Sequence, residues 1–447
     1  MPAWADHAIW WHIYPLGFTG ASQSAPAPGS PVEHRLAHLT GWLDYVLELG
    51  ANGLLLGPVF ASETHGYDTI DYLRIDPRLG DDADWDTFVA GARAKGLRIL
   101  LDGVFNHVGR GHPRFVAALA DGPDSPSGRW FRWAPDADGV LVPEVFEGHG
   151  GLVALNHANP EVADYVAEVM IHWLDRGADG WRLDAAFAIP ADFWRRVLPT
   201  VRAAHPDTWI VGEMIHGDYS GYVAESGIDS VTQYELWKAL WSSILDANLH
   251  ELAWTLGRHN EFAEHFLPLT FAGNHDVTRF ASRITDPRHL THVLAVLFLV
   301  AGSPAVYSGD EQGFRGVKEE REGGDDAVRP TFPASPGELA QVGWPTYREH
   351  QRLIGLRRNH AWLAHARSTV LHVTNEHLVL AADSTVEGTT AAGSPEGGAR
   401  LVLVLNLADD PFEPPVPVGE LVLTSGDEDG TAAPGLIAPH AWAVFRA

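Results

Sequence analysis

Short apolar runs alternate with longer amphipathic stretches through most of the chain. The apolar runs have the length of β-strands, and eight of them lie at 9–14, 53–59, 97–104, 180–185, 209–214, 232–236, 267–272 and 305–308. Between them, apolar residues recur every three or four positions, most clearly at 36–49, 85–94, 160–176, 193–204, 250–266 and 288–300. Short buried strands that alternate with helices are typical of parallel βαβ units. Eight strands in succession predict an α/β fold, a closed (β/α)8 or TIM barrel rather than an open sheet.

Two segments interrupt this alternation. Residues 108–155 are rich in Gly, Pro, aromatic and acidic residues without a clear helical period, and they follow the third strand, which predicts an inserted domain. After residue 361 the pattern becomes all-β, with apolar runs at 368–373, 378–382, 401–407, 420–424 and 441–446 and a Gly/Ser/Thr-rich stretch at 384–398 that we interpret as an exposed hairpin loop. We expect a barrel of residues 1–107 and 156–361, an inserted domain of residues 108–155, and a C-terminal antiparallel β-sandwich of residues 362–447.

Composition narrows the classes of partner. The chain has 31 Lys+Arg against 58 Asp+Glu, a formal net charge of −27, which disfavours nucleic acid and favours neutral partners. It has no cysteine, which excludes disulfides, thiol nucleophiles and thiolate metal sites. The first residues lack the features of a secretory signal, and the longest apolar run, 293–301, is far shorter than the ~20 residues of a membrane span. We therefore expect a cytoplasmic protein that does not enter a membrane.

The candidate chemistry lies at the carboxyl ends of the predicted strands, where barrel enzymes carry their active sites. Asp184, Glu213 and Asp276 end the fourth, fifth and seventh strands, so we expect them to meet at one mouth of the barrel. Mutual repulsion would raise some of their pKa values, and such a division between carboxylates suits glycoside cleavage. Arg182, two residues before Asp184 and on the same side of the strand, would keep Asp184 ionised as a nucleophile. Glu213, with no cation beside it in sequence, is the better general acid and base.

The motifs at these strand ends resemble the conserved regions of the α-amylase family of glycoside hydrolases. They are DGVFNH at 102–107, GWRLDAAFA at 180–188, VGEMIH at 211–216 and FAGNHD at 271–276, in the family's order. The resemblance extends to HGYD at 65–68 and to residues 302–313, and it implies the family's barrel, its inserted B domain and its β-rich C domain.

The resemblance implies a role for each residue of the acidic cluster. Asp184 matches the nucleophile, Glu213 the general acid and base, and Asp276 the carboxylate that stabilises the transition state. Arg182 matches the arginine that orients the nucleophile, and Asp102 matches a buried acid that supports this arginine. The implied reaction is retaining cleavage of an α-glucosidic bond through a covalent glycosyl-enzyme.

Further positions are expected to bind substrate. His107 and His275 match histidines that hydrogen-bond the sugar at the cleavage point, and Tyr67 matches the aromatic residue that stacks on that sugar. Phe187 replaces a polar residue on the leaving-group side, and we expect a sugar ring to stack on it there. His216, in the Glu213 motif, is also a candidate substrate-binding residue. Other aromatic residues expected near the mouth are Trp130, Phe131, Trp133, Phe146 and Trp181.

Within the family, the motifs around Asp184 and Glu213 are most similar to those of the cyclomaltodextrinase and neopullulanase branch. That branch is largely intracellular and acts on small cyclic or branched malto-oligosaccharides. It usually carries an additional N-terminal β-domain used in dimerisation, which we do not see before the first strand, so we expect a monomer or a homodimer. An α-glucosidase or an α-glucan transglycosylase, such as a trehalose-forming enzyme, is the alternative, and α-1,4 against α-1,6 preference stays open.

We expect no required cofactor and no catalytic metal. Residues 185–188 stand where typical α-amylases have a Lys-His pair that helps to bind substrate and calcium, so a structural calcium ion is not favoured. A metal-dependent hydrolase on this barrel needs a His-x-His pair on the first strand, which offers His12 alone. A cluster of His107, His216 and His275 would leave the three carboxylates unexplained. A non-catalytic relative is also disfavoured, because such proteins lose catalytic residues that this chain keeps.

Overall fold

The centre of the molecule is a barrel of eight short parallel strands. A computed structural model describes residues 1–27, 29–321, 323–385, 398–425 and 435–447. The barrel strands are β1 (Trp10–Ile13), β2 (Gly53–Leu56), β5 (Arg98–Gly103), β10 (Gly180–Leu183), β11 (Trp209–Gly212), β12 (Ser230–Val231), β13 (Leu269–Phe271) and β14 (Ser303–Tyr307). They pair in the order β12-β11-β10-β5-β2-β1-β14-β13, and a parallel bridge between Thr232 and Leu269 joins the two ends. The predicted TIM barrel is confirmed.

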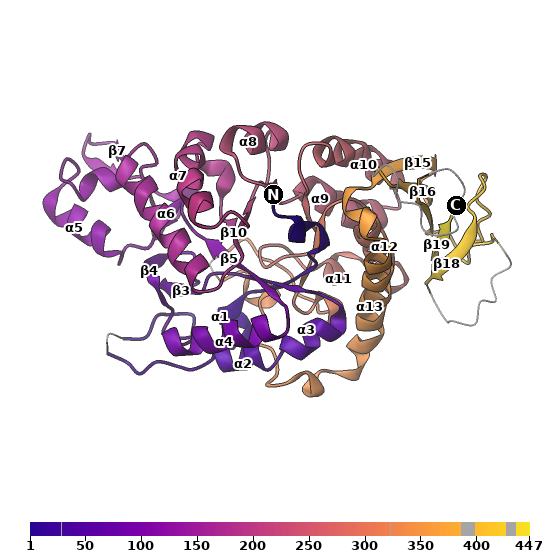
Figure 1. The fold of residues 1–447 in the computed structure, drawn as a ribbon, viewed down its shortest axis with the longest axis horizontal. Coiled ribbons are helices and arrows are strands. Elements are labelled where there is room, and N and C mark those ends of the chain that lie inside the picture. The colour runs from indigo at the N-terminus through magenta and orange to yellow at the C-terminus, as the bar shows by residue number, and fades with distance from the viewer. Residues whose placement is uncertain (28, 322, 386–397, 426–434) are drawn as a thin grey trace.

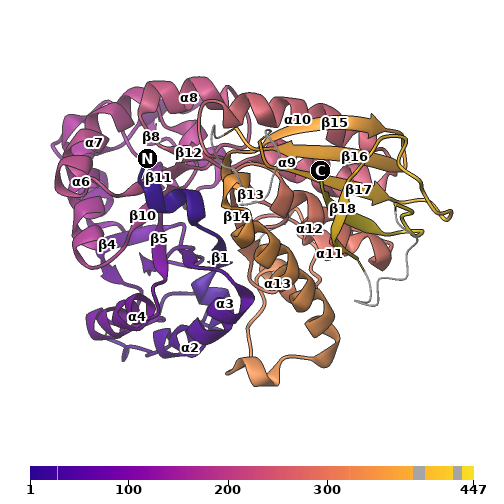
Figure 2. The same ribbon diagram turned by 45° about the vertical axis from the view of Figure 1, so that its right-hand side comes forward.

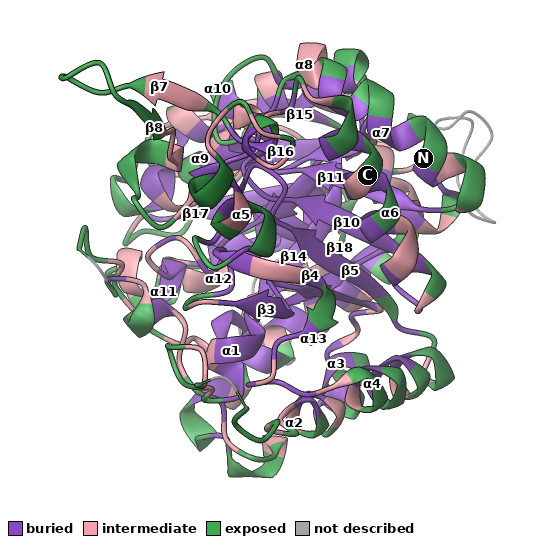
Figure 3. Ribbon diagram, turned by 90° about the vertical axis from the view of Figure 1, so that its left-hand side faces the viewer, coloured by how far each residue is buried: buried purple, intermediate pink, exposed green. Residues whose placement is uncertain are grey.

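Burial on both faces explains why these strands read as continuous apolar runs. Apart from Arg98, every residue of the eight strands is buried, because side chains fill the barrel on one face and helices cover the other. Figure 3 shows this buried interior inside a rim of exposed helices. Two charged residues that interrupt these runs are paired across the sheet: Arg182 of β10 lies opposite Asp102 of β5 in the parallel register.

Helices surround the barrel and connect its strands (Figures 1 and 2). They are α1 (Pro15–Phe18), α2 (Leu36–Thr40), α3 (Leu43–Leu49), α4 (Asp82–Ala94), α6 (Pro160–Asp175), α7 (Ala191–Ala204), α8 (Tyr219–Ser226), α9 (Tyr234–Leu245), α10 (Leu249–Ala263), α11 (Phe280–Arg283), α12 (Leu290–Leu299) and α13 (Trp344–Asn359). The six predicted helical stretches are all helical, although 36–49 is interrupted between α2 and α3 at Gly41 and Trp42. Helices α1, α8, α9, α11 and α13 lie outside the predicted helical stretches. No helix in the described ranges is long and apolar enough to cross a membrane.

The sixth predicted strand is wrong in its bounds. We expected a strand over 232–236, but β12 ends at Val231 and α9 begins at Tyr234. The side-chain oxygen of Gln233 accepts the backbone N–H groups of Glu235 (3.1 Å) and Leu236 (3.2 Å), which caps the new helix. The alternation of apolar and polar residues in this short segment therefore spans a strand end and a helix start.

The segment after β5 forms the predicted insertion, which lies at the left of Figure 1. It holds one helix and two small antiparallel sheets: α5 (Pro113–Asp121), β6 (His107–Val108) paired with β9 (Val153–Ala154), and β7 (Trp133–Pro135) paired with β8 (Leu141–Pro143). A further two-stranded sheet, β3 (Phe60–Ser62) with β4 (Thr69–Ile75), follows β2. We did not predict α5. The β6–β9 pair returns the chain to the barrel mouth, which places the end of the insertion beside the strand ends.

The C-terminal part is antiparallel β-structure, as predicted, although its described strands form one five-stranded sheet rather than the two sheets of a sandwich. Its strands pair in the order β15-β16-β17-β19-β18, which are β15 (Arg367–Val373), β16 (His377–Asp383), β17 (Arg400–Asn406), β19 (Trp442–Arg446) and β18 (Glu420–Thr424). One face of this sheet packs with the barrel core next to α10 and α12, and segments 408–418 and 435–441 cover the other face. Most of the predicted hairpin loop, residues 386–397, lies outside the described residues.

Candidate functional site

A cavity of about 910 Å³ opens at the carboxyl ends of the barrel strands. Asp184, Glu213 and Asp276 all line it, so the three carboxylates expected from separate strands do meet at one site. Of the predicted binding residues, Tyr67, His107 and Phe187 also line the cavity. Asp102, Arg182 and His275 lie buried next to these residues, whereas His216 is exposed at the edge. Loops after β1 and β14 close the other side of the cavity.

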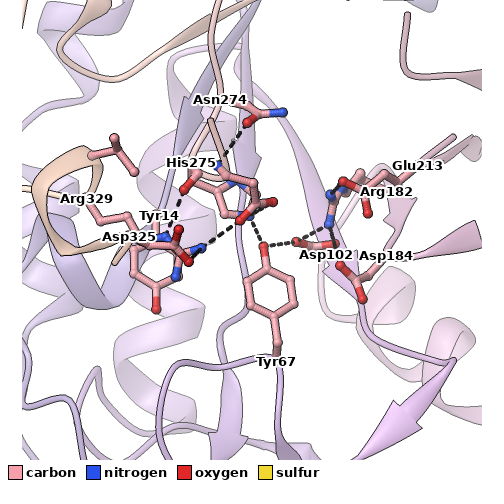
Figure 4. A network of polar contacts seen from close by, with 12 residues as sticks. Tyr14, Tyr67, Asp102, Arg182, Asp184, Glu213, Asn274, His275, Asp325 and Arg329 are labelled. Carbon is pink, nitrogen blue, oxygen red and sulfur yellow. Dashed lines mark hydrogen bonds and ion pairs between the residues drawn. The ribbon is translucent and has the colours of Figure 1, made fainter. Parts of the chain in front are cut away.

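Arg182 is the centre of the acidic cluster (Figure 4). Its Nη1 donates to both oxygens of Asp102, at 2.8 Å each, and to Oδ1 of Asp184 at 3.1 Å. Its Nη2 forms an ion pair with Oε1 of Glu213. All four side chains are nearly buried, so one guanidinium serves three carboxylates that have little contact with water.

Because one guanidinium is shared by three buried carboxyl groups, Asp184 holds its proton more strongly than an isolated Asp does. Burial and the charge of Glu213 raise the pKa of Asp184 well above its usual value, against the opposing effect of Arg182. Burial also raises the pKa of Asp102, although Arg182 again opposes it. Arg182 does lower the pKa of Asp184, as expected, but burial and the charge of Glu213 outweigh it in the free site, where three acids share this one cation. The cluster keeps a proton at a higher pH than an isolated carboxyl group would.

Glu213 is held from two sides in addition to Arg182. Its Oε2 accepts the backbone N–H of Ala185 at 3.0 Å, and its Oε1 accepts the hydroxyl of Tyr234 at 3.2 Å. Asn274 donates to the oxygen of that hydroxyl at 2.8 Å. Ala185 has a left-handed backbone (φ 45°, ψ 39°), which turns its N–H toward Glu213 directly after β10. These contacts fix the carboxyl group in one orientation beside Asp184.

Asp276 lies in a cationic environment, unlike Asp184. Its Oδ1 accepts Nη2 of Arg329 at 2.6 Å, and its Oδ2 lies 3.0 Å from Nε2 of His275. Burial opposes ionisation, but the charges of His275, Arg329 and Arg182 hold the pKa of Asp276 well below its usual value. The site thus contains one carboxylate, Asp276, whose pKa is lowered, and two buried carboxyls, Asp184 and Asp102, whose pKa values are raised.

Aromatic rings form the wall between these two groups of acids. The Tyr67 ring is stacked on the His275 ring with centroids 5.5 Å apart, and the Tyr14 ring is stacked on His275 at 5.9 Å. The Tyr67 hydroxyl donates to Oδ2 of Asp102 at 3.0 Å and also contacts Nε2 of His275 (Figure 4). Tyr67 therefore links the Arg182 cluster to the Asp276 side.

The edge of the cavity is more apolar. The His107 ring is stacked on Phe146 from the insertion at 5.0 Å, and Phe146 lies 6.3 Å from Phe187. His216 packs against Phe187 with centroids 5.1 Å apart. Burial lowers the pKa of His107 to about 4, so this ring is neutral near pH 7. Of the other aromatic residues expected near the mouth, Trp130, Phe131 and Trp181 are core residues, and Trp133 packs against the core.

Comparison with known proteins identifies the family. The profile of the alpha amylase catalytic domain matches residues 13–337, well over half of the chain. The chain belongs to the α-amylase family. A cyclomaltodextrinase of Geobacillus thermopakistaniensis is 29% identical over 93% of this chain and 71% of its own length. Neopullulanase 2 of Thermoactinomyces vulgaris is 32% identical over 71% of this chain, which spans 58% of that protein. Several of these curated relatives are thus considerably longer than the aligned part.

Solved structures agree on the fold over the whole chain. A cyclic α-maltosyl-(1→6)-maltose hydrolase of Arthrobacter globiformis, in complex with that cyclic sugar, superposes with a TM-score of 0.80 and 24% identity, covering 100% of this chain and 99% of that one. A cyclomaltodextrinase superposes with a TM-score of 0.80 and 26% identity, covering 100% of this chain and 77% of that one.

Four residues of this α-amylase family site were not among the sequence-predicted site residues. Tyr14 follows β1 and Tyr234 opens α9, so a survey of all eight strand ends could have found both. Arg329, whose Nε also donates to the His275 carbonyl at 2.9 Å, and its ion-pair partner Asp325 lie between β14 and α13, where the sequence shows no regular element. No signal in the sequence pairs them with Asp276.

The described residues do not place a cluster of metal ligands at the mouth of the barrel. Within them, the groups of His, Asp and Glu close enough to share an ion are Asp286, His289 and His440, and, on the surface, His34, Asp81 and Asp84. His107, His216 and His275 do not form such a group. His12 packs edge-on against His275, with ring centroids 5.0 Å apart, so it is a packing partner within this family barrel.

Proposed function

We propose that this protein is a retaining α-glucoside hydrolase that cleaves α-1,4 and also α-1,6 bonds of small cyclic or branched malto-oligosaccharides. The observation that carries the proposal is the division of the acids around the cavity. Asp184 and Glu213 share the single guanidinium of Arg182, and burial with the charge of Glu213 raises the pKa of Asp184, while Arg329 and His275 help to hold the pKa of Asp276 low. A retaining glycosidase needs a carboxylate nucleophile beside a protonated acid, together with negative charge near an oxocarbenium-like transition state.

In the first step, Asp184 attacks the anomeric carbon of the bound sugar. The bond from that carbon to the bridging oxygen breaks, and the proton held by the cluster passes from Glu213 to the departing oxygen. The product is a glycosyl ester on Asp184 and a Glu213 carboxylate. Arg182 contacts both carboxyl groups, so it can offset the charge that moves from Asp184 to Glu213.

In the second step, the Glu213 carboxylate takes a proton from water as the water oxygen bonds to the anomeric carbon. The ester bond breaks and Asp184 leaves as a carboxylate, so the site returns to its starting protonation. A sugar hydroxyl in place of water gives transglycosylation. The apolar edge formed by Phe146 and Phe187 favours this transfer as a side reaction, since sugar rings stack on aromatic faces.

The preference for small cyclic or branched substrates rests on the relatives. Proteins similar to this chain are named cyclomaltodextrinase and neopullulanase, and one of similar fold is named for a cyclic sugar with a 1→6 bond. One relative is named an intracellular maltogenic amylase, which supports a cytoplasmic location. We further propose that the enzyme works as a monomer or homodimer without a required cofactor or a structural calcium ion.

Product analysis on a matched panel tests the proposal. The purified protein is incubated with linear maltohexaose, a cyclomaltodextrin, an α-1,6-branched oligosaccharide and soluble starch, and the released sugars are followed in time together with their anomeric form. We expect α-anomeric products, with faster turnover of the cyclic and branched substrates than of starch. Products of the β-anomer would contradict the retaining mechanism. Starch as the best substrate would contradict the size preference, and inactivity on every α-glucoside would contradict hydrolase function.

A further inference from the structure

A second cluster of side chains joins the barrel to the C-terminal sheet, remote from the catalytic cavity. His289 and Asp286 lie just before α12, and His440 lies just before β19. Each residue has one ligand atom, a ring nitrogen or a carboxylate oxygen, within 4.8 Å of those of the other two. All three side chains are half-buried, and none of them belongs to the catalytic site.

The two imidazoles face each other in an unusual way. Nε2 of His289 lies 2.9 Å from Nδ1 of His440. The outer nitrogen of His440, Nε2, lies 2.8 Å from the Asp409 carboxylate, which can only accept a hydrogen bond. This carboxylate therefore holds the His440 ring proton on Nε2, which leaves Nδ1 as an acceptor directed at His289.

Neutral imidazole has one N–H and one lone pair. The lone pair of His440 Nδ1 therefore faces the ring nitrogen of His289, and these two nitrogens can converge on one cation together with the Asp286 carboxylate. An imidazole whose other nitrogen donates to a carboxylate or carbonyl is the usual form of a metal-bound histidine. His440 also has a left-handed backbone (φ 53°), a conformation that non-glycine residues adopt at a cost and that here directs its ring toward His289.

We propose that His289, His440 and Asp286 bind a zinc-class divalent ion that links α12 to the C-terminal sheet. Imidazole nitrogen with carboxylate oxygen suits zinc, cobalt and nickel, whereas calcium and magnesium prefer oxygen ligands alone. Two histidine nitrogens on a tetrahedral zinc ion lie about 3.3 Å apart, so the observed pair needs to open only slightly. Water completes the fourth position.

Arg288 competes for the carboxylate. Its Nη2 donates to Oδ2 of Asp286 at 2.6 Å, and its Nε donates to Oδ1 at 3.0 Å. The backbone N–H of Arg288 also donates to Oδ1 at 2.9 Å. The Arg288 side chain is 56% exposed, so it can turn into water and release one oxygen of Asp286 to the ion.

Titration with zinc chloride tests the site. The full chain is produced without a polyhistidine tag, treated with a chelator, and titrated by calorimetry, with Co²⁺ absorption as a second readout. We expect one equivalent of zinc, a Tm that rises with zinc concentration, and no such rise with Ca²⁺ or Mg²⁺. His289→Gln and His440→Asn each remove a ligand of the ion, so each should weaken zinc affinity more than about 100-fold. Loss of a residue that only orients a ligand costs roughly 10–100-fold. Asn tolerates the left-handed backbone of residue 440.

Three further variants separate this site from adventitious binding. Asp409→Asn should weaken zinc binding about tenfold through His440. Arg288→Gln should tighten it, because the competing cation is gone. His34→Asn, in the exposed group with Asp81 and Asp84, is the matched control and should change nothing. The proposal is overturned if the wild type does not bind zinc, or if His440→Asn binds it equally well. It is also overturned if the zinc affinity falls with His34→Asn or stays unchanged with Arg288→Gln.

Discussion

Arg182 has to serve three carboxylates at once, and this sharing explains the chemistry of the free site. The guanidinium touches Asp102, Asp184 and Glu213, all of them nearly buried. A single cation cannot neutralise three anions, so burial raises the pKa of Asp184 and of Asp102. The buried cluster therefore keeps a proton at a pH at which an isolated carboxyl group has lost it.

Glu213→Gln tests which group delivers that proton. Gln keeps the shape and an oxygen for the N–H of Ala185, but it has no carboxyl proton to give. We expect turnover of a malto-oligosaccharide to fall roughly 10²–10⁴-fold, while the Kd measured by calorimetry stays within about threefold. A substrate with an activated aryl leaving group should lose less in its first step, because its oxygen departs without protonation.

Glu235→Gln is the matched control for this substitution. Glu235 lies on α9 and pairs with Arg258 outside the cavity, so activity should be unchanged. If the Glu213 variant keeps a tenth of normal activity, the assignment of the acid is wrong.

Asp184→Asn should increase stability, and the increase should grow with pH. Because the folded state raises the pKa of Asp184, ionisation of this group costs more in the folded than in the unfolded chain. The wild type therefore loses stability as the pH rises above the unfolded value of about 4, and Asn removes this loss. Urea unfolding at pH 4 and pH 8 should show a small difference at pH 4 and a clear gain at pH 8.

The exposed Asp192→Asn, on the surface of α7, is the control for this comparison and should show no such trend. A variant that is less stable than the wild type at both pH values would contradict the pKa shift. The Asp184→Asn variant should also form no glycosyl ester, because it lacks the nucleophilic carboxylate.

At the scale of elements, the fold was predictable where the pattern is local. Seven barrel strands and the five C-terminal strands overlap the predicted ranges, because each is a short apolar run. The barrel strands are buried along almost their whole length, whereas β15 and β18 are partly exposed. The region around Gln233 was mispredicted because its capping bonds, rather than its hydrophobic period, decide where β12 ends and α9 begins. Arg329 could not be placed, since only the folded chain brings it to Asp276.

The edge of the cavity combines two elements that are distant in sequence. Phe187 lies in the turn after β10, and Phe146 comes from the insertion. Phe187→Ala should raise KM for maltohexaose roughly tenfold, about the energy of one lost stacking contact. Turnover of α-glucosyl fluoride should change little, because its sugar lies at Asp184 and its leaving group is a single atom that does not reach Phe187.

Val142→Ala is the matched control, because Val142 is exposed on β8 of the same insertion and does not line the cavity. Phe115→Ala is unsuitable, because Phe115 is a core residue. Equal losses on both substrates would argue that Phe187 supports the catalytic groups rather than a distant sugar.

At the scale of the whole molecule, barrel and C-terminal sheet share one hydrophobic core. Leu380, Leu403 and Trp442 of the sheet belong to the same buried cluster as the barrel helices. The indole N–H of Trp442 donates to Oγ1 of Thr291 on α12 at 3.0 Å. We infer that the two parts unfold together, because separating them would expose this shared apolar surface.

Trp442→Ala tests this coupling. Trp442 is fully buried, so the variant should lose about 3–5 kcal/mol of stability through lost burial and the cavity left behind. Because the core is shared, the loss should lower the unfolding midpoint of barrel and sheet alike. Catalytic activity, which reports the barrel, and tryptophan fluorescence should therefore still disappear in one transition on heating. Trp254→Ala is the matched control, since Trp254 on α10 is 66% exposed and its loss should cost little. If the Trp442 variant instead melts in two steps, with activity surviving the first, the barrel is stable without the sheet and the two parts do not unfold cooperatively.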